Sequence, residues 1–400
     1  MIQVEGIFAS SGRATSTSAK WDDVTFIDYD GSVLYSYSLA EAQALAELPA
    51  LPSHDGLVCQ GWNWTLEAIK ALNRPITVGA MYITDDGATR LHIRIATVGR
   101  MTVPLYIGQT VANGVSIDWG DGSTTQTLSG TGNVNTSHTY AEPGDYVISL
   151  MPQDGCTLSF GDGSYSYCVM GSIGDNGLVY CNMLQNVSIG KNVTSIGNSA
   201  FYNCYSLASI TIPIGVTSIG NYTFLRCYSL ASVTIPAGVT SIGTDTFQSC
   251  YSLASITIPT SVTSIGSSSF QSCYSIANIK IPDGITSIGN YAFSNCYSLT
   301  SVDIPDGVAS IGNGAFSSCR ALASVTIPGS VTSIGTRGFS DCYGMRYYDF
   351  SACTSIPALS STNVFDNIPS DCQMLIPSAL YNRWKTATNW ATYASKMVSV

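Results

Sequence analysis

The sequence is poor in charge: Lys, Arg, Asp and Glu make up only 10% of its 400 residues, where about a quarter is usual. The 16 Lys and Arg residues form no basic run and are outnumbered by 26 Asp and Glu, so the net charge is -10. Binding to nucleic acid needs clustered cations that neutralise phosphates. Nucleic acid is therefore excluded as a main partner.

Long apolar runs are also missing. Nothing in the chain approaches roughly 18 consecutive apolar residues, the length that a membrane span needs. Residues 1–20 contain no apolar core of a signal peptide, and residues 396–400 show no wall-sorting or lipid-anchor signal. We therefore expect no membrane insertion and no export by the general secretory route.

Histidine is scarce, and the three histidines, His54, His92 and His138, lie in different segments. None belongs to an HExxH motif, and the chain has no GxSxG motif, phosphate-binding loop or paired-carboxylate pattern. A catalytic site needs a nucleophile, base or metal ligands that converge. The sequence therefore predicts a protein without enzymatic activity, cofactor or metal.

The sequence is rich in repetition. Cysteine recurs every 23 residues, and columns of phenylalanine, glycine and proline keep the same period. The column positions are Cys181, Cys204, Cys227, Cys250, Cys273, Cys296, Cys319 and Cys342, and Phe201, Phe224, Phe247, Phe270, Phe293, Phe316 and Phe339. In each unit a short strand alternates apolar and hydroxyl residues and ends at a proline. No unit can bury its apolar face alone, so neighbouring units must stack.

These units resemble the leucine-rich repeats of the BspA-like type, which are found in surface proteins of bacteria and protists. The resemblance implies a solenoid over residues 181–350. Open solenoid ends expose strand edges, so we expect an N-terminal cap at residues 154–180 and a C-terminal cap at 351–400. In the second cap, an amphipathic helix is indicated by the spacing of Leu380, Trp384, Ala387 and Ala391.

Two further motifs stand in the first half of the chain. The segments SIDWGDGS (116–123) and HTYAEPGDYVISL (138–150) resemble a PKD domain, an immunoglobulin-like β-sandwich, at residues 91–153. Residues 24–64 resemble an internalin-type B-repeat, which implies a small β-grasp-like module at 21–90. Residues 1–20 are rich in Ser, Thr and Gly, as in a flexible tether. The predicted fold is mostly β and multi-domain, with these two modules before the solenoid.

Three features allow two interpretations. Cysteines on neighbouring coils are close enough for disulfides, but their inward position favours core packing as small apolar side chains. The segment Asp28-Tyr29-Asp30-Gly31 resembles the start of a calcium loop, and Asp118 with Asp121 could also hold a cation. Asp and Gly equally stabilise turns, and we favour turns at both places.

Two outward columns are candidate ligand-binding surfaces. The first is a tyrosine column, interrupted by Arg320, made of Tyr205, Tyr228, Tyr251, Tyr274, Tyr297 and Tyr343. Tyrosines in a row offer stiff contact area to a protein or sugar, or they stack on each other and shield the rim. The second is the strand face, made of Ser209, Thr211, Ser232, Thr234, Asn278, Lys280 and Asp303.

The sequence therefore predicts a non-enzymatic adhesion or recognition protein that binds a protein or carbohydrate of a bacterial or host surface through the solenoid. Because no export signal is visible, the leading hypothesis is a phage or prophage virion protein, with other virion proteins as possible partners of its N-terminal region. A bacterial cell-surface adhesin and a structural virion or scaffold component without a ligand are the alternatives. The expected location is the virion, the cell surface or the extracellular space, and the expected state is a monomer.

Overall fold

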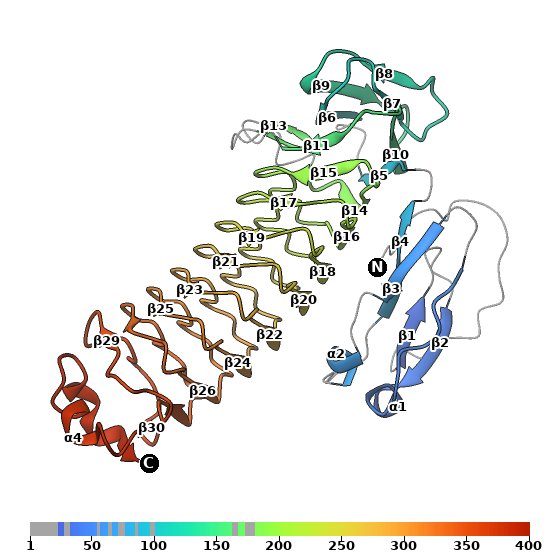
Figure 1. Cartoon of the computed structure of the whole chain (residues 1–400). Coiled ribbons are helices and arrows are strands. Elements are labelled where there is room, and N and C mark those ends of the chain that lie inside the picture. Colours follow the sequence, from blue (N-terminus) through green and yellow to red (C-terminus); the bar gives the residue numbers. More distant parts are fainter. Residues whose placement is uncertain are drawn as a thin grey trace. The chain divides into compact units, whose positions relative to one another are not determined.

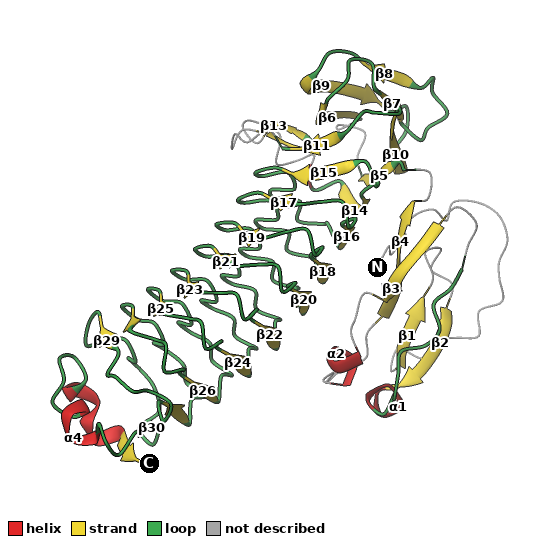
Figure 2. Cartoon of the chain, viewed as in Figure 1, coloured by secondary structure: helices red, strands yellow, loops and turns green. Residues whose placement is uncertain are grey.

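The computed structural model is mostly β, with few and short helices (Figures 1 and 2). It describes residues 23–27, 33–53, 57–62, 66–70, 77–84, 87–96, 101–161, 167–172 and 181–400. Short parallel strands stack on coils of the C-terminal half, which confirms the predicted fold class. The predicted tether and the Asp28–Gly31 segment lie outside the described residues.

The chain divides into two compact units. The first holds Met1–Ser195, Asn203–Val216 and Leu230–Thr234, and the second holds Ile196–Tyr202, Thr217–Ser229 and Ile235–Val400. The first unit thus contains the N-terminal modules and strands of the first coils, and the second contains the remaining coils.

A four-stranded mixed sheet begins the first unit. Its elements are β1 (Asp23–Ile27), β2 (Val33–Ser38), α1 (Leu39–Gln43), β3 (Leu57–Trp62), α2 (Leu66–Lys70) and β4 (Thr77–Thr84). The strand order is β2-β1-β4-β3, in which the central pair is parallel and both outer pairs are antiparallel. Ser38 caps α1 in a capping box with Glu41, which satisfies backbone N–H groups at the helix start.

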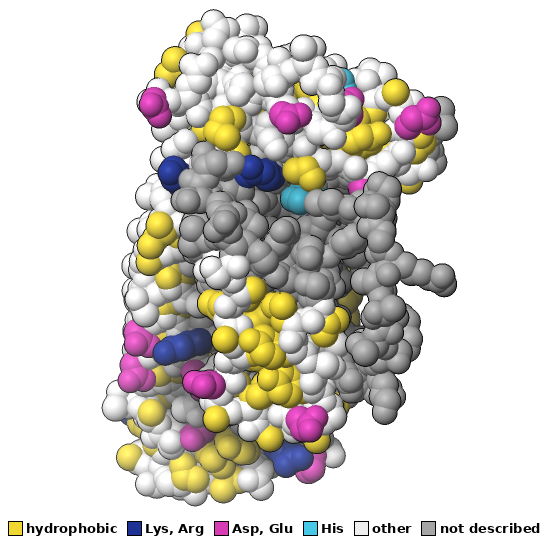
Figure 3. All heavy atoms as spheres, turned by 90° about the vertical axis from the view of Figure 1, so that its right-hand side faces the viewer, with side chains coloured by type: hydrophobic (Ala, Val, Ile, Leu, Met, Phe, Trp, Pro, Cys, Tyr) yellow, Lys and Arg dark blue, Asp and Glu magenta, His cyan; other side chains and the backbone are white. Residues whose placement is uncertain are grey.

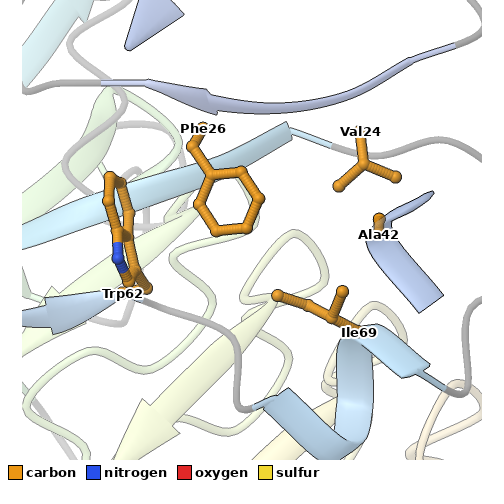
Figure 4. Packing of buried hydrophobic residues seen from close by; sticks show 5 residues of the cluster. All are labelled: Val24, Phe26, Ala42, Trp62 and Ile69. Carbon is orange, nitrogen blue, oxygen red and sulfur yellow. The ribbon is translucent and has the colours of Figure 1, made fainter. Parts of the chain in front are cut away.

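Five buried side chains form the core of this module: Val24, Phe26, Ala42, Trp62 and Ile69 (Figure 4). The rings of Phe26 and Trp62 meet edge to face, with centroids 5.0 Å apart. The indole Nε1–H of Trp62 donates to the carbonyl of Pro49 at 2.7 Å, so the one polar atom of the side chain is satisfied. The likeness to a B-repeat stays a prediction.

The middle of the first unit contains strands of two larger sheets and one separate strand pair. They are β5 (Thr89–Ile95), β6 (Thr102–Gln109), β7 (Val115–Asp118), β8 (Gln126–Leu128), β9 (Gly132–Thr139), β10 (Gly144–Pro152), β11 (Leu158–Phe160), β12 (Tyr167–Cys168), β13 (Gly171–Ser172), β14 (Leu184–Ser188), β15 (Val193–Ile196), β16 (Ser209–Thr211) and β18 (Ser232–Thr234). One sheet has the order β18-β16-β14-β5-β10-β7-β8, and the other contains β15-β11-β6-β9. β12 and β13 form a separate antiparallel pair.

The strands β5 to β10 of the PKD-like region and the first coil share both sheets. β5 pairs with β10 on one side and, antiparallel, with β14 on the other. β14 in turn begins the parallel ladder through β16. In the second sheet, the N–H of Leu158 in β11 donates to the carbonyl of Asn192 at 3.3 Å. β5 thus covers the strand edge of β14 that an open solenoid would leave exposed.

Two parallel strand columns run along opposite sides of the coils in the second unit (Figure 1). One contains β17 (Ser218–Ile219), β19 (Ser241–Ile242), β21 (Ser264–Ile265), β23 (Ser287–Ile288), β25 (Ser310–Ile311), β27 (Ser333–Ile334) and β29 (Ala358–Leu359). The other contains β20 (Ser255–Thr257), β22 (Asn278–Lys280), β24 (Ser301–Asp303), β26 (Ser324–Thr326), β28 (Tyr347–Asp349), β30 (Gln373–Ile376) and β31 (Met397–Ser399). Equivalent residues pair at the repeat spacing, as Ile265 does with Ile288.

Turns rather than helices connect the two columns, and left-handed residues recur in them. Ser268 and Ser272 have φ of 53° and 62°, and Tyr291 and Asn295 have φ of 56° and 60°. Their N–H groups donate to the following coil, as from Ser272 to the carbonyl of Ser294 at 2.7 Å. The hydrogen bonds between coils therefore compensate for a backbone conformation that L-residues seldom adopt.

The coil interior contains the repeated phenylalanines and cysteines. From Phe201 to Phe339, successive rings stack with centroids between 5.2 and 5.5 Å apart. The cysteines from Cys250 to Cys342 are fully buried. Each thiol donates to the carbonyl of the phenylalanine 26 residues earlier, at 3.1 Å from Cys273 to Phe247. This geometry supports core packing rather than disulfide bonding.

The end of the chain differs from the expected amphipathic helix. α4 (Tyr381–Trp384) has only four residues, a 3-10 helix η2 follows at Ala391–Lys396, and Ala391 is exposed. Asn389 stops a continuous helix, because it takes a φ of 63° and its side chain donates to the carbonyl of Leu359 at 2.8 Å. Trp384 and Trp390 pack on Phe350 at 5.4 and 5.2 Å. Strand stacking continues past residue 350 through β30 and β31.

Candidate recognition surface

Four tyrosines form a stacked ladder beside the strand column of β20 to β30. The ring centroids of Tyr228, Tyr251, Tyr274 and Tyr297 are 4.6, 4.6 and 4.7 Å apart, and the ring planes differ by 4°, 2° and 9°. Each ring follows a buried cysteine, so the coil spacing of about 4.8 Å fixes the ring spacing. All four side chains are half-buried.

The stacking decides which part of each ring a ligand can reach. Both faces of Tyr251 and Tyr274 are covered by neighbouring rings, so only the ring edges and hydroxyl groups remain. Burial raises the pKa of the Tyr274 hydroxyl, which therefore stays protonated as a donor at neutral pH. Of the two sequence-based interpretations, the mutual stacking is present; ligand binding stays a prediction.

Arg320 continues the ladder rather than interrupting it. Its guanidinium carbon lies 4.4 Å from the ring centre of Tyr297 and 6.0 Å from that of Tyr343. An arginine over a tyrosine face makes a cation–π contact that replaces ring stacking. Tyr343, at the end of the ladder, is 55% exposed. Tyr205, at the other end of the sequence column, is half-buried and belongs to the first unit.

A hydrogen-bonded aspartate holds Tyr343. Its hydroxyl donates to Asp341 Oδ1 at 3.1 Å, and the Asn367 side-chain amide donates to the same oxygen at 2.8 Å. The Asn367 hydrogen bond lowers the pKa of Asp341, and bonding to the Asp341 carboxylate raises the pKa of Tyr343. Both groups therefore keep their ordinary protonation state at neutral pH.

The predicted strand face is only partly open. Thr234, Asn278, Lys280 and Asp303 are exposed, and Lys280 lies opposite Asp303 in the register of β22 and β24. Ser209, Thr211 and Ser232 are buried, so the expectation that these three face solvent is wrong. Ser209 donates to Asn186 Oδ1 at 2.9 Å, a hydrogen bond that compensates for burial of its hydroxyl.

Figure 3 shows the molecule from the right-hand side of Figure 1. Hydrophobic side chains, which in this view include tyrosine, gather in a band, and Lys, Arg, Asp and Glu side chains lie beside it.

The aspartates of the PKD-like region, Asp118 and Asp121, accept backbone hydrogen bonds in turns. The Gly120 N–H donates to Asp118 Oδ1 at 2.9 Å, and the Ser123 N–H donates to Asp121 Oδ1 at 3.0 Å. His138 Nε2 lies 2.6 Å from Asp121 Oδ2. Within the described ranges, no group of three or more His, Cys, Asp or Glu is placed to hold a metal. This geometry favours the turn interpretation.

The cysteine column offers no reactive thiol to a ligand. Burial raises the pKa of Cys296 and of Cys342 to about 12, and it also raises the pKa of Cys250 and Cys273. Since the thiolate is the nucleophile and metal ligand, these side chains stay inert.

Two exposed residues were not among the predicted site residues. Arg346 and Tyr347 stand at outward positions where other coils carry Ala and Ser, such as Ala323 and Ser324. The signal was available in the sequence: a large residue at an exposed repeat position has no role in stacking. Only the departures from the repeat, rather than the repeat itself, could have indicated them.

The repeats match the family described as BspA type Leucine rich repeat region, in six copies, over residues 171–298 and 286–381. These ranges cover just over half of the chain, and the chain belongs to this family. No curated protein sequence matches it. The PKD-like and B-repeat-like identities of the first half stay predictions.

Several solved structures are similar to the chain. A leucine-rich repeat protein from Bacteroides ovatus ATCC 8483 is 33% identical over 46% of this chain and 53% of that one, with a TM-score of 0.40. This chain thus spans about half the length of that protein. The T. pallidum Leucine Rich Repeat protein is 31% identical over 40% of this chain and 83% of that one, with a TM-score of 0.36. A leucine rich cell surface protein from Faecalibacterium prausnitzii A2-165 is 27% identical over 57% and 78%, with a TM-score of 0.32.

Among the described residues, no helix combines the length and the apolar character needed to cross a membrane.

Proposed function

We propose that this chain is a non-enzymatic recognition protein that binds a protein on a bacterial or host surface through the tyrosine ladder and the neighbouring strand face. The observation that carries the proposal is the ladder itself, with rings 4.6 to 4.7 Å apart. Rings held in this way lose little conformational entropy when a partner binds. Membership of a leucine-rich repeat family supports the assignment.

The geometry of the rings favours a protein over a sugar as the partner. Sugars bind aromatic side chains mainly through the ring faces, and neighbours cover both faces of Tyr251 and Tyr274. Ring edges and hydroxyl groups suit aliphatic and polar protein side chains. The exposed Asn278, Lys280 and Asp303 beside the ladder add polar contacts with which a protein surface can pair.

A cell-binding assay with the labelled full chain tests the proposal. We expect saturable binding to some members of a panel of bacterial and epithelial cells, and loss of binding after protease treatment of those cells. The variant Asn278→Ala/Lys280→Ala/Asp303→Ala should bind at least about tenfold more weakly, the effect of losing about 1.4 kcal/mol. The matched control, Ser241→Ala/Ser264→Ala/Ser287→Ala, changes three exposed residues of the opposite column and should bind as the unaltered chain does.

Each other outcome has a definite meaning. Binding that survives protease but not glycosidase treatment would show a glycan partner. An equal loss of cell binding in both variants would mean that the binding site is not on the strand face of Asn278, Lys280 and Asp303. Absence of saturable binding to every cell type would favour the structural scaffold role and contradict the proposal.

The setting of this binding is part of the proposal. A virion released by lysis and a bacterial cell surface are the two candidate settings, and the surface role of BspA-like proteins supports the second. Antibody detection on purified virions and on intact cells separates the two.

A further inference from the structure

The last regular coil departs from the repeat at exposed positions. The residue at the position before the exposed strand residue is Ala in five of the seven preceding coils, and Gln185 and Thr300 in the other two, but Arg346 here. The first strand residue is Ser or Asn elsewhere, but Tyr347 here, and it is 40% exposed. One coil earlier, Arg320 replaces the ladder tyrosine. Stacking explains the repeated residues, so these departures need another explanation.

These departures gather in one place with Tyr343, and we call Arg320, Tyr343, Arg346 and Tyr347 the Arg–Tyr patch. Arg320 and Tyr343 are neighbours in the ladder, 6.0 Å from guanidinium carbon to ring centre. Gly344 lets the two coils approach closely, because a Cβ there would lie 2.6 Å from the carbonyl oxygen of Arg320. Arg346 and Tyr347 follow on the same coil.

The backbone under the patch is fixed from both sides. The Arg346 N–H donates to the carbonyl of Ala323 at 2.8 Å, and the Arg346 carbonyl accepts from the Gln373 N–H at 2.9 Å. In the strand register, Tyr347 lies between Ser324 and Gln373. Hydrogen bonds to both neighbouring coils thus hold the backbone of Arg346 and Tyr347 in place.

The positive charge of the patch is not neutralised within the described part of the chain. Arg346 makes no ion pair there, and Arg320 makes only its cation–π contacts. The nearby carboxylates are engaged locally: Asp341 accepts from Tyr343 and Asn367, and Asp349 accepts from the Ser351 N–H at 2.8 Å. Two guanidinium groups are left for a ligand.

We propose that the Arg–Tyr patch binds an acidic, carboxylate-bearing segment of a partner protein. Arginine recognises carboxylates with two parallel hydrogen bonds, and stacking of Arg320 against Tyr297 holds its planar group in place. Tyrosine and arginine are also the residues that dominate binding energy at protein interfaces. The inference rests on the proposed function and names the chemistry of the partner.

The repeat supplies a variant that should fold. Arg320→Tyr/Arg346→Ala/Tyr347→Ser restores the residues that stand at these positions in other coils, so it removes both guanidinium groups while a tyrosine continues the ladder at position 320. The matched control Arg226→Ser also restores the residue of other coils, such as Ser249 and Ser272, and removes one exposed cation that lies outside the strand face and the Arg–Tyr patch. Circular dichroism of both variants should equal that of the unaltered chain.

The probes are fluorescent poly-L-glutamate, polygalacturonate and a neutral polyglutamine-containing peptide, measured by anisotropy on the full chain. We expect salt-dependent binding of polyglutamate only. The restored variant should lose at least about tenfold in affinity, as expected for a residue cluster that dominates binding. The control variant should change by less than about twofold.

Failure of this inference is distinguishable from failure of the proposed function. If polyglutamate does not bind, or binds the restored variant equally, while cells still bind the unaltered chain, the inference is wrong and the proposed function stands. Preference for polygalacturonate would identify an acidic glycan and overturn the choice of a protein partner. Absence of cell binding would instead contradict the proposed function.

Discussion

At the scale of single residues, the glycine column fixes how closely the coils stack. A Cβ on Gly289 would lie 2.8 Å from the backbone carbon and oxygen of Gly266, closer than real Cβ contacts. The same crowding recurs at Gly266 and Gly312, each against the coil before it. The backbone cannot move without disturbing the hydrogen bonds between coils.

Gly289→Ala should therefore destabilise the chain by about 1–3 kcal/mol, the usual cost of overpacking. Gly284→Ala is the matched control, because its Cβ would lie 3.5 Å from the nearest atom, a methyl carbon of Thr263. Thermal unfolding followed by circular dichroism should show a lower midpoint for the first variant only. Equal midpoints for both would mean that the coils can separate at Gly289 at little cost.

For single residues, burial could be predicted from the sequence where the same residue type recurs in every coil. The burial of Cys250 or Phe270 follows from its column, because every coil places it in the same environment. It failed for Ser209 and Ser232, which occupy the same repeat position as the exposed Asn278 and Ser301. Burial of these serines depends on what lies over their coils, and the repeat pattern contains no information about that.

At the scale of elements, the tyrosine ladder contributes stability as well as surface. Tyr274 stacks on Tyr251 and Tyr297 at 4.6 and 4.7 Å. Each such pair contributes about 0.5–1.5 kcal/mol beyond burial of area. The sequence indicated the column and left two interpretations open, ligand binding and mutual stacking, because the repeat spacing alone does not give the orientation of the rings.

Tyr274→Ala should lower the free energy of unfolding by about 1–3 kcal/mol through the loss of two ring pairs. Tyr274→Phe keeps the stack and removes only the hydroxyl, so its stability should match that of the unaltered chain. Urea unfolding measures both variants. An equally small effect of alanine would mean that the rings are adjacent without stabilising each other.

The cysteine column should make the chain sensitive to alkali. Burial raises the pKa of Cys296 and Cys342 to about 12, whereas a thiol in the unfolded chain titrates near pH 8.5. Below that value both states hold the proton and stability is unaffected. Above it the unfolded state releases the proton first, so stability falls as pH rises toward about 12.

Each such thiol should contribute a decline of about 1.4 kcal/mol per pH unit in this window. Cys296→Ala should show a shallower decline than the unaltered chain between about pH 9 and 11, even if it is less stable at neutral pH. Urea unfolding at a series of pH values gives the two slopes. Parallel slopes would show that Cys296 reaches solvent in the folded state.

At the scale of the whole chain, closure of the solenoid's first strand could not be predicted from the sequence. The repeat pattern indicates that strands stack but not what lies beyond the first strand. In the structure β14 pairs with β5, about ninety residues earlier in the chain. Pairing between strands so distant leaves no periodic signal: β5 alternates buried and more exposed residues, and β14 is buried at four of its five positions, but neither pattern identifies the partner strand.

This pairing predicts which part of the chain must accompany the repeats. A fragment of residues 87–400 retains β5, β10 and β14, so it should stay monomeric and unfold in one sharp thermal transition. A fragment of residues 181–400 leaves the edge of β14 open and should self-associate, because an open edge pairs with other strands. Light scattering after size-exclusion chromatography and circular dichroism measure both properties.

A third fragment, residues 154–400, distinguishes the cap expected from the sequence at residues 154–180 from a cap formed by the strands that pair with β14 and β11. It contains the cap expected from the sequence but lacks β5 and β6, the strands with which β14 and β11 pair. If β5 and the other strands of the PKD-like region cap the solenoid, this fragment should self-associate as residues 181–400 do. In it, Leu184 and Val187 of β14 lose the sheet with which they pack. If the 154–400 fragment is as monomeric and stable as the 87–400 fragment, residues 154–180 are a sufficient cap. The strands of the PKD-like region would then pair with the solenoid without being needed to cap it.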